Sequence, residues 1–327
     1  MRIFQGKIEI AGQIGILCGE LKRRGHLAAG YNTFHSYLGY RDHLINTNEE
    51  EVRRTYLHMV HFFDLFHFHY ASSLLDSFED LPIIQAKGKK MIMHHWGNDV
   101  RFHGQARHSN KYVYTGDSPP DEKMHQQLTT ISTYIKEAIV QDYEVYAYVA
   151  PYYENVHVVP IGIHLQQFTP AYPPIDKSKL LVLHAPTNPD FKGTEQVEAA
   201  IRQLQPFYDF EYKRIEKMNH EEAVKLYRDA DIIIDQLRCG SYGLLSVESM
   251  ALGKPVLAYL RDDLVQRFPP DLPIVNAHPG NVTSRLQWLL DNADIRHELG
   301  RKGRSYVEKH HAVEVVVDQL QSIYEQL

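Results

Sequence analysis

Short apolar runs alternate with longer amphipathic segments along most of the chain, and this alternation limits the folds that it can adopt. The run Asp231–Asp235, for example, places three consecutive isoleucines between its two aspartates, as expected of a strand with both faces covered. A strand, a helix and a second strand in succession predict parallel sheets with right-handed crossovers. We therefore expect an α/β fold made of doubly wound sheets.

The expected strands fall into two series, which indicates two sheets rather than one. The first series holds Leu27–Tyr31, Asp64–Tyr70, Lys90–His95, Leu128–Ile131 and Val156–Pro160. The second holds Leu180–His184, Phe210–Lys213, Asp231–Asp235, Pro255–Tyr259 and Leu272–Asn276. The expected helices include Gln13–Arg24, Ser132–Tyr148, Thr194–Leu204, His220–Asp229 and Gly243–Leu252. The last segment, Ile295–Leu327, is expected to form two helices.

A segment with three prolines, Gly162–Lys179, separates the two series and is typical of a linker. The 327 residues suit two domains of about 150 residues each. We expect a first domain over 1–165, a second over 166–309 and a final helix over 310–327 that packs back on the first. Two such domains facing across a cleft would bring the carboxyl ends of their strands to one crevice, where ligands bind in such folds.

Composition excludes several classes of protein. Lys and Arg number 35 against 41 Asp and Glu, a net charge of −6, and neither half is basic, which disfavours a nucleic-acid partner. Two cysteines rule out a disulfide framework and suit the reducing cytosol. The first residues lack the apolar core of a signal peptide, and no run reaches the length of a membrane span. We expect a cytoplasmic protein, and peripheral contact with the inner membrane face stays open.

Polar side chains follow the expected strand Lys90–His95. The sequence there is His94-His95-Trp96-Gly97-Asn98-Asp99-Val100-Arg101. Polar groups at the carboxyl end of a parallel strand face the ligand crevice. A histidine there can donate to a sugar hydroxyl and a carboxylate can fix an acceptor hydroxyl, so we assign His94, His95 and Asp99 to the catalytic centre. The alternative is a structural loop in which Asp99 caps the next helix.

Two other motifs of the first half are weaker. Gly12-Gln13-Ile14-Gly15 opens an expected helix, where glycines let a phosphate or sugar approach free N–H groups. An ordinary turn before a helix explains it about as well. His67 and His69 alternate along one strand and could hold a metal, but no cysteine or carboxylate cluster completes a ligand set nearby. We therefore expect polar histidines and no metal.

The second half holds the most informative motif. An apolar strand ends at Asp235, a glycine-containing loop follows, and a helix begins near Gly243. Free N–H groups at that helix start can hold a diphosphate, and Glu248, about one turn further on, can accept hydrogen bonds from ribose hydroxyls. An earlier loop that contains Asn188 ends in Lys192-Gly193-Thr194 at another helix start, where the lysine and the helix dipole favour phosphate.

These motifs together resemble those of the family-4 retaining glycosyltransferases of GT-B fold. The similarity extends over most of the chain and is most specific at Gly243-Leu244-Leu245-Ser246-Val247-Glu248-Ser249-Met250-Ala251-Leu252-Gly253-Lys254-Pro255-Val256. The other matching segments are Ile10–Gln13, Gly97–Arg101, Val159–Ile163, Asn188–Thr194 and Leu299–Glu308. The resemblance implies two Rossmann-like domains, with a nucleotide-sugar donor in the second and an acceptor in the first.

The resemblance also implies roles for individual residues. Lys192 would bind the donor diphosphate, the Gly243–Leu245 backbone would cap its phosphates, and Glu248 would hold the ribose. Either His94 or His95 would contact the donor sugar, since the doublet leaves the register open. The expected donor-binding residues are Gly12, Gln13, Gly15, Asn188, Lys192, Gly193, Ser241, Tyr242, Gly243, Leu244, Leu245 and Glu248. The donor would be a UDP-sugar, and transfer to an acceptor hydroxyl would retain configuration and need no metal or cofactor.

Two positions depart from the family pattern. Gly240 stands where the first Glu of the E-x7-E motif falls, and Pro186 stands where a basic residue usually precedes the lysine. The groups that could substitute are Ser241, Tyr242, Asp235 and, as phosphate cations, Arg101 and Arg238. These departures keep open a non-catalytic nucleotide- or glycan-binding relative, and a nucleotide-sugar epimerase is a further alternative. The acceptor, whether glycan, lipid-linked, small molecule or protein, is open.

Overall fold

The computed structural model describes residues 1–327 and divides into two compact α/β units. The first unit comprises Met1–Gln105, Thr115–Gly162 and Val313–Leu327, and the second comprises Ala106–Tyr114 and Ile163–Ala312. The expected linker thus begins where the first unit gives way to the second. Ala106–Tyr114 falls in the first domain expected from the sequence, but it belongs to the second unit.

The first unit is built on one parallel sheet with the strand order β3-β2-β1-β4-β5-β6-β7. Its strands are β1 (Arg2–Gly6), β2 (Leu27–Asn32), β3 (Leu44–Asn46), β4 (Leu65–His69), β5 (Lys90–His95), β6 (Glu137–Val140) and β7 (Asn155–Val158). Its helices are α1 (Gln13–Arg23), α2 (Glu49–Phe62), α3 (Asp80–Ala86), α4 (His103–Ser109), α5 (Asp121–Tyr134), α6 (Tyr143–Val149) and α13 (Val313–Gln326), of which α4 runs on into the second unit. The strand order changes direction between β1 and β4, and open parallel sheets bind ligands at such a point.

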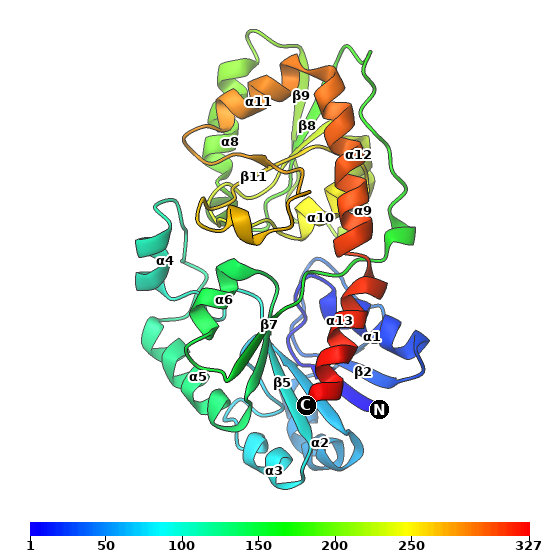
Figure 1. Cartoon of the computed structure of the whole chain (residues 1–327), viewed down its shortest axis with the longest axis vertical. Helices are drawn as coiled ribbons and strands as arrows, with labels where there is room; N and C mark the ends of the chain where they lie inside the picture. The colour runs from blue at the N-terminus through cyan, green and yellow to red at the C-terminus, as the bar shows by residue number, and fades with distance from the viewer. The chain divides into compact units, whose positions relative to one another are not determined.

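Helices α1 and α13 pack together against this sheet (Figure 1). The buried apolar residues of α13 recur at helical spacing and are Val313, Val316, Val317, Leu320, Ile323 and Tyr324. They share one core cluster with Ile14 and Leu17 of α1 and with Ile3 and Leu65 of the sheet. The C-terminal helix therefore completes the core of the first unit, as expected from the sequence.

The second unit is built on a parallel sheet with the order β12-β11-β10-β8-β9. Its strands are β8 (Leu180–His184), β9 (Phe210–Arg214), β10 (Ile232–Ile234), β11 (Val256–Ala258) and β12 (Val275–Asn276). Its helices are α7 (Pro189–Lys192), α8 (Thr194–Leu204), α9 (His220–Asp229), α10 (Leu244–Ala251), α11 (Val282–Asp291) and α12 (Ala293–His310), with short 3-10 turns at Leu165–Gln167 and Val265–Arg267. The order changes direction between β8 and β10.

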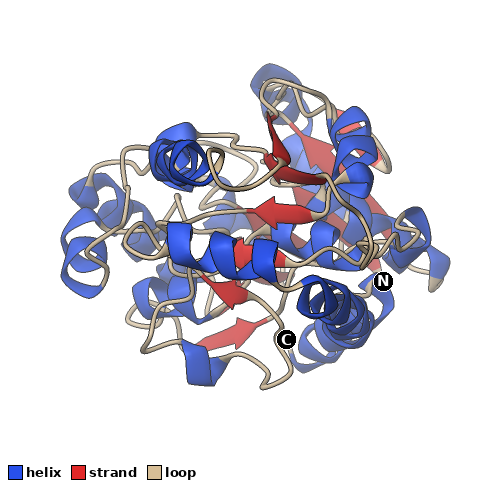
Figure 2. Ribbon diagram, turned by 90° about the horizontal axis from the view of Figure 1, so that it is seen from above, coloured by secondary structure: helices blue, strands red, loops and turns tan.

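Both sheets are covered by helices, and Figure 2 shows strands lying between helices. In the second unit, buried residues of α8 and α11, such as Val197 and Leu286, share a core cluster with Ile232 and Ile234 of β10. The side chains of β10 are completely buried. The apolar run Asp231–Asp235 therefore contains a central strand, β10. This confirms the expected α/β fold.

The expected strand Leu128–Ile131 is wrong, because these residues belong to α5. Met124, Leu128 and Ile131 are the buried residues of that helix, and their spacing of four and three residues is helical. A short apolar run is compatible with a strand or with a helix. Here the spacing of the buried residues beyond the run shows that it belongs to a helix.

The expected helix Ser132–Tyr148 is also wrong, because it contains the end of α5, strand β6 and most of α6. Ala138, Ile139 and Val140 of β6 are completely buried, which favours a central strand. Asp142 then starts α6, since its side chain accepts hydrogen bonds from the first backbone N–H groups of that helix.

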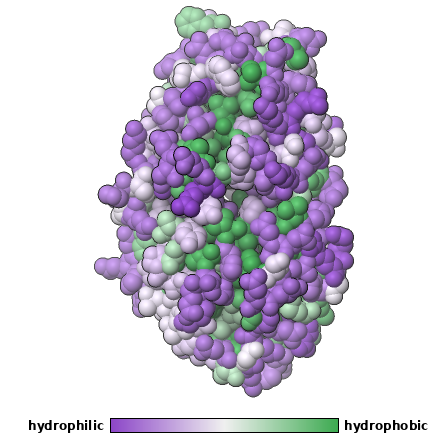
Figure 3. Space-filling view, viewed as in Figure 1, coloured by the Kyte–Doolittle hydropathy of each residue, from purple (hydrophilic) through white to green (hydrophobic).

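None of the helices combines the length and the apolar character needed to cross a bilayer. In Figure 3, hydrophilic and hydrophobic side chains are interspersed over the visible face. Cys18 and Cys239 are both free and buried, so no disulfide joins them.

Candidate functional site

A buried ion pair lies at the point where the second sheet changes direction. Lys192, the last residue of α7, donates from Nζ to Asp235 Oδ1 at 2.6 Å and to Gln236 Oε1 at 2.9 Å. Asp235 directly follows β10 and is fully buried. Burial alone would raise the pKa of Asp235, but the charge and hydrogen bond of Lys192 outweigh it, and the pKa is lowered. Two of the three ammonium hydrogens of Lys192 are thus used within the protein, which leaves the third for a ligand.

The same carboxylate organises the start of α10. Asp235 Oδ2 accepts from Ser246 Oγ at 2.6 Å and from Gly243 N at 3.3 Å. Gly243 precedes α10 without a side-chain cap, and the first turn holds no acidic residue. The backbone N–H groups of Leu244 and Leu245 therefore lie at an uncapped helix start, where the partial positive charge suits an anion.

Glu248 lies about one turn into α10 and is held by α9. Its Oε1 accepts from His220 Nε2 at 2.5 Å. Burial alone would lower the pKa of His220, but the hydrogen bond and charge of Glu248 outweigh it, and that pKa is raised. The pair fixes Glu248 and leaves its second oxygen for a ligand hydroxyl. Sequence reasoning missed His220, because no local spacing links residues from two separate helices.

Gly240 stands in the loop before α10 because the chain turns there with a left-handed backbone. Its φ is +95°, a conformation that glycine adopts readily and other residues adopt at a cost. A Cβ at this position would lie 3.1 Å from Cδ of Arg261, and that side chain is held by Asp263 at 2.6 Å. A glutamate therefore cannot occupy position 240 without strain, so the departure from the family pattern is built into the loop.

Ser241 and Tyr242 are bound to the interior of the second unit. The Ser241 carbonyl accepts from Gln236 Nε2 at 2.5 Å. The Tyr242 hydroxyl lies 3.0 Å from both Tyr306 Oη and His311 Nε2. These contacts hold the loop in shape and direct the Tyr242 hydroxyl into the unit.

Asn188 and Gly193 shape the segment that carries Lys192. Asn188 Oδ1 accepts from the backbone of Asp190 at 2.9 Å and of Phe191 at 3.2 Å, which caps α7. Gly193 ends α7 and begins α8. Both residues therefore position the lysine through the backbone.

The two arginines proposed as phosphate cations belong to different units. Arg101, in the first, is buried and donates from Nε and Nη2 to the Glu144 carboxylate at 2.9 and 2.8 Å. Arg238, in the second, donates to the carbonyls of Tyr112 and Asp190 at 2.7 and 3.0 Å. Because both of these acceptors are neutral, Arg238 keeps its charge for an anion, whereas Glu144 compensates that of Arg101.

In the first unit, His95, the last residue of β5, forms a hydrogen-bonded pair with Asp99 in the loop that follows. His95 Nδ1 lies 2.7 Å from Asp99 Oδ2, and His95 Nε2 lies 2.8 Å from Tyr153 Oη. Asp99 Oδ1 also accepts from the backbone of Trp96 and Gly97 at 3.0 and 2.9 Å. His95 therefore has no ring nitrogen left for a ligand, and Asp99 holds the turn together.

His94 points to the opposite face of the sheet. Its Nδ1 lies 3.2 Å from His67 Nε2, and its ring stacks on Trp96 with the centroids 4.0 Å apart. Burial lowers the pKa of His94 well below its usual value, so the ring is neutral. Its Nε2 is buried without a hydrogen-bond partner. Of the doublet, His94 is therefore the residue with an open ring nitrogen.

His67, His69 and His94 lie close enough to be considered as metal ligands, since their ring nitrogens are within 4.8 Å of one another. The rings are stacked nearly parallel, however, with interplanar angles of 16° for His67–His69 and 12° for His67–His94. The lone pair of an imidazole nitrogen lies in the plane of its ring, so rings stacked in separate parallel planes do not direct their lone pairs at one ion. As they stand, the three rings therefore do not converge on one point.

The start of α1 is capped by a residue that sequence reasoning missed. The Glu9 carboxylate accepts from the Gly15 backbone at 3.2 Å, while Gly12 precedes the helix without a side-chain cap. Burial raises the pKa of Glu9 to about 8. Gln13 is committed elsewhere, since its amide exchanges hydrogen bonds with the Gly162 backbone at 2.9 and 3.1 Å. The lack of Ser, Thr, Asp or Asn before α1 was the signal for a more distant cap.

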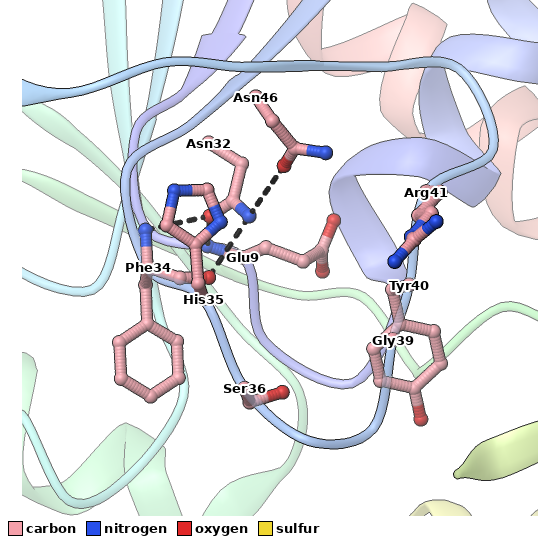
Figure 4. Close-up of a pocket in the computed structure, with 9 residues that line it drawn as sticks. All are labelled: Glu9, Asn32, Phe34, His35, Ser36, Gly39, Tyr40, Arg41 and Asn46. Atoms are coloured by element: carbon pink, nitrogen blue, oxygen red, sulfur yellow. Dashed lines mark hydrogen bonds between the residues drawn. The ribbon is translucent and has the colours of Figure 1, made fainter.

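A pocket of about 290 Å³ in the first unit includes Glu9 in its wall (Figure 4). Asn32 Oδ1 accepts from the Phe34 backbone at 2.9 Å, and Asn32 Nδ2 donates to Asn46 Oδ1 at 3.1 Å. The full lining is Glu9, Asn32, Phe34, His35, Ser36, Gly39, Tyr40, Arg41 and Asn46. Polar groups and two aromatic rings thus surround one cavity, a mixture that suits a polar ligand with an apolar face.

Comparison with known proteins bears on the fold. No model of a known protein family matches the chain, and no curated protein matches it. Among solved structures, sucrose-phosphate synthase from Thermosynechococcus elongatus matches with a TM-score of 0.70 and 16% identity, over 100% of this chain and 99% of that one. HepE from Anabaena, solved with UDP, matches with a TM-score of 0.69 and 10% identity, over 100% of each chain.

A third similar structure is that of trehalose-6-phosphate synthase, studied as a case of enzymatic glycosyl transfer with retention. It matches with a TM-score of 0.65 and 11% identity, over 100% of this chain and 99% of that one. At such low identities, a match along the whole chain shows a shared fold. The chain therefore has the two-sheet GT-B fold of glycosyltransferases, as the resemblance in its sequence predicted.

Proposed function

We propose that this protein is a glycosyltransferase that moves a sugar from a UDP-sugar to an acceptor hydroxyl, with retention of configuration and without a metal. The observation that carries the proposal is the meeting of Lys192 and the uncapped start of α10 at one buried carboxylate, Asp235. This arrangement lies where the second sheet changes direction, which is where doubly wound sheets bind nucleotides.

The residues of this site suit a nucleoside diphosphate that leaves during the reaction. As the sugar–phosphate bond breaks, negative charge builds up on the diphosphate, and Lys192 with the N–H groups of Leu244 and Leu245 would stabilise it. Because these groups are fixed before the reaction, little reorganisation is needed. Glu248, held by His220, would accept hydrogen bonds from the ribose hydroxyls. The departing phosphate oxygen would take the acceptor proton, so we assign no separate base.

The uridine base of the donor, the retention of configuration and the independence of metal are supported by different observations. The uridine base is supported by HepE, whose fold is similar and which has been solved with UDP and with UDP-glucose. Retention is supported by the similar fold of trehalose-6-phosphate synthase. Metal independence is supported by the lysine and the helix start, which would supply the positive charge that a metal ion provides in other transferases.

We also propose that the acceptor binds in the first unit, in the pocket lined by Asn32 and Asn46. Amide side chains and aromatic rings such as that of Tyr40 suit a ligand with several hydroxyl groups. Asn46→Ala should then raise the KM for a sugar acceptor and leave the hydrolysis of the UDP-sugar unchanged. Equal effects on both reactions would contradict this placement.

A turnover assay tests the proposed activity. The protein is incubated in EDTA with UDP-glucose, UDP-galactose or GDP-mannose, with and without simple glycosides as acceptors, and UDP or GDP release is measured. We expect release of UDP from a UDP-sugar, and NMR of the product should show the anomeric configuration of the donor. Inverted product would contradict retention, and activity that EDTA abolishes and zinc restores would contradict metal independence. Conversion of the donor to a different nucleotide sugar would indicate an epimerase.

A second candidate function is a binding protein without turnover. It is favoured by two observations, the fixed left-handed turn at Gly240 and the partial neutralisation of Lys192 by Asp235. A protein of this kind would bind UDP in a titration but release no UDP from any UDP-sugar. The turnover assay therefore separates the two functions.

A further inference from the structure

The first sheet carries a group of buried polar side chains on the face covered by α13. Gln5 pairs with His67 across β1 and β4, and His69 pairs with His94 across β4 and β5. Tyr324 of α13 lies against them, with its hydroxyl 2.6 Å from His67 Nδ1. All five residues are buried, so they must satisfy one another's hydrogen bonds. We call the six residues Trp96, His69, Gln5, Tyr324, His67 and His94 the histidine relay.

A single donor fixes the direction of the hydrogen bonds at one end of the relay. The indole N–H of Trp96 can only donate, and it lies 3.2 Å from His69 Nδ1, so this nitrogen accepts. Burial lowers the pKa of His69 well below its usual value, so the ring is neutral and its proton sits on Nε2. That nitrogen lies 3.3 Å from Gln5 Oε1 and donates to it. A flipped Gln5 amide would set two N–H groups against each other.

The same direction continues to the other end. The Gln5 amide nitrogen faces Tyr324 Oη at 3.5 Å. Burial raises the pKa of Tyr324, so its hydroxyl keeps its proton and donates to His67. Burial also lowers the pKa of His67 to about 3, so this ring is neutral and donates from Nε2 to His94 Nδ1 at 3.2 Å. His94 accepts at Nδ1 and, being neutral, carries its own proton on Nε2.

We propose that the histidine relay fixes His94 as a hydrogen-bond donor, from Nε2, to an oxygen atom of a sugar bound at the carboxyl edge of the first sheet. The other five members of the relay act as positioning residues. This inference rests on the proposed function, and it adds the tautomer of His94 and the groups that set it.

The location and environment of His94 Nε2 support a ligand contact. This atom is buried without a partner in the protein. His94 is the second-last residue of β5, at the edge where parallel sheets bind ligands. A buried donor without a partner is costly, so an oxygen placed there gains a strong contact. Because the relay runs one way, a hydroxyl, ether or phosphate oxygen fits this position, whereas a ligand N–H group or a sugar lacking that oxygen does not.

Nitrogen NMR of protein labelled with ¹⁵N-histidine reads the tautomer of each ring without relying on activity. The His94 signals, assigned by their loss in His94→Gln, should show a proton on Nε2 and none on Nδ1 at neutral pH. Tyr324→Phe removes the hydroxyl that donates to His67, so His67 and His94 should then sample both tautomers. Tyr148→Phe removes another buried hydroxyl of the first unit, one that donates to Glu144 at 3.2 Å, and should leave His94 unchanged.

The activity assay gives a second readout of the same pair of variants. With the donor that supports turnover, Tyr324→Phe should lower kcat/KM several-fold, because only part of the His94 population then presents its Nε2 proton to the sugar. Tyr148→Phe should keep the wild-type value. An equal loss in both variants would indicate a general effect of removing buried hydroxyls and would overturn the positioning role.

Other outcomes test the histidine relay separately from the proposed function. A proton on Nδ1 of His94 in the wild type, or an unchanged His94 in Tyr324→Phe, would overturn the relay whether or not the protein is an enzyme. If Tyr324→Phe does not fold, Trp96→Phe, which removes the donor that starts the relay, serves with the same expectation. Joint shifts of the His67, His69 and His94 signals on addition of Zn²⁺ would indicate a metal site instead. The predicted tautomers in a protein that releases no UDP would leave the relay standing and refute only the proposed function.

Discussion

At the scale of single residues, one buried carboxylate connects the parts of the candidate donor site. Asp235 accepts hydrogen bonds from Lys192, from Ser246 and from the Gly243 backbone. A lysine and a helix start that are far apart in the sequence are thereby held together at one point. The Asp235 carboxylate partly neutralises the charge of Lys192. The lysine therefore has a structural role as well as an electrostatic one.

The first residue-scale prediction concerns the stability of this ion pair. Lys192→Met should lower the free energy of unfolding by about 3–5 kcal/mol, because it leaves the carboxylate of Asp235 buried without its partner. The double variant Lys192→Met with Asp235→Asn should regain much of that loss, since no charge remains buried. Urea denaturation measures both. Wild-type stability in Lys192→Met alone would contradict the pairing.

The second concerns activity at the ribose end of the site. Glu248→Ala should lower kcat/KM at least tenfold, about 1.4 kcal/mol in the transition state, because a hydroxyl of the donor loses its acceptor. Glu195→Ala, which removes an exposed carboxylate from α8, is the matched control and should leave kcat/KM unchanged. Steady-state kinetics with a UDP-sugar give both values. Near-normal turnover in Glu248→Ala would remove this residue from the site.

The third residue-scale prediction concerns glycine at position 240. It separates the cost of the positive φ from the cost of the contact with Arg261. Gly25, after α1, also has a positive φ of +84°, but a Cβ there would meet nothing within 4 Å. Gly25→Ala should therefore cost about 1–2 kcal/mol, the backbone term alone. Gly240→Ala should cost more, because its Cβ also presses on Arg261. Thermal or urea unfolding compares them, and equal costs would show that the Arg261 contact relaxes freely.

At the scale of elements, the sequence predicts helices with a clear hydrophobic period well and several short strands poorly, among them the buried strand β6. Helices α8 and α9 were predicted with the bounds that they have, because their apolar residues recur with a clear helical period. Strand β3 was missed, since its three residues are partly or fully exposed and carry no apolar pattern. Leu128–Ile131, within α5, was predicted as a strand because four residues are too few to show whether the period is that of a strand or of a helix.

The candidate site follows the same rule. Lys192 and Glu248 were predicted as site residues because they stand in motifs whose spacing is local. Their partners Asp235 and His220 come from other strands and helices, and only the fold brings them together. The sequence alone likewise could not show which residue of the His94–His95 doublet would face a ligand, because that depends on the face of β5 that each ring occupies.

The contact between α9 and α10 makes stability depend on pH. The pKa of His220 is raised above its ordinary value of 6.5 in the folded state, so the stabilisation by its pair with Glu248 is fully present below that value. It is lost as the pH rises through the raised pKa. The difference in unfolding free energy between the wild type and His220→Gln should therefore be largest in mild acid and shrink in alkali.

Urea denaturation at a series of pH values measures this difference. His67, whose pKa is lowered to about 3 by burial, acts in the opposite sense, since its contribution is lost as the pH falls below its ordinary value. It does so in both proteins and cancels in the comparison. A difference that grows towards alkaline pH would contradict the assignment of His220.

At the scale of the whole molecule, the chain leaves the first unit at Gly162 and returns to it at Val313. The returning helix α13 supplies a large part of the apolar core against α1 and also supplies Tyr324 to the histidine relay. The last residues of the chain thus contribute both to the stability of the first unit and to the state of His94. The first unit is therefore not expected to fold as a stable domain without them.

A substitution within α13 tests this dependence. Leu320→Ala should lower the free energy of unfolding by about 2–5 kcal/mol, because it removes a completely packed side chain from the core. Ser322→Ala, on the exposed side of the same helix, should change it by less than about 0.5 kcal/mol. Urea denaturation of both variants measures the difference. A mild effect of Leu320→Ala would contradict the central place given to α13.

The central claim is that the second unit binds a nucleoside diphosphate at Lys192 and the start of α10. The most direct measurement is a thermal-shift panel with UDP, GDP, ADP and CMP, in EDTA, on the wild type and Glu248→Ala. A ligand at 100 times its Kd stabilises by about 2.7 kcal/mol, so we expect a clear shift with UDP that is reduced in Glu248→Ala. No shift with any nucleotide, or an equal shift with UDP in the two proteins, would contradict the claim.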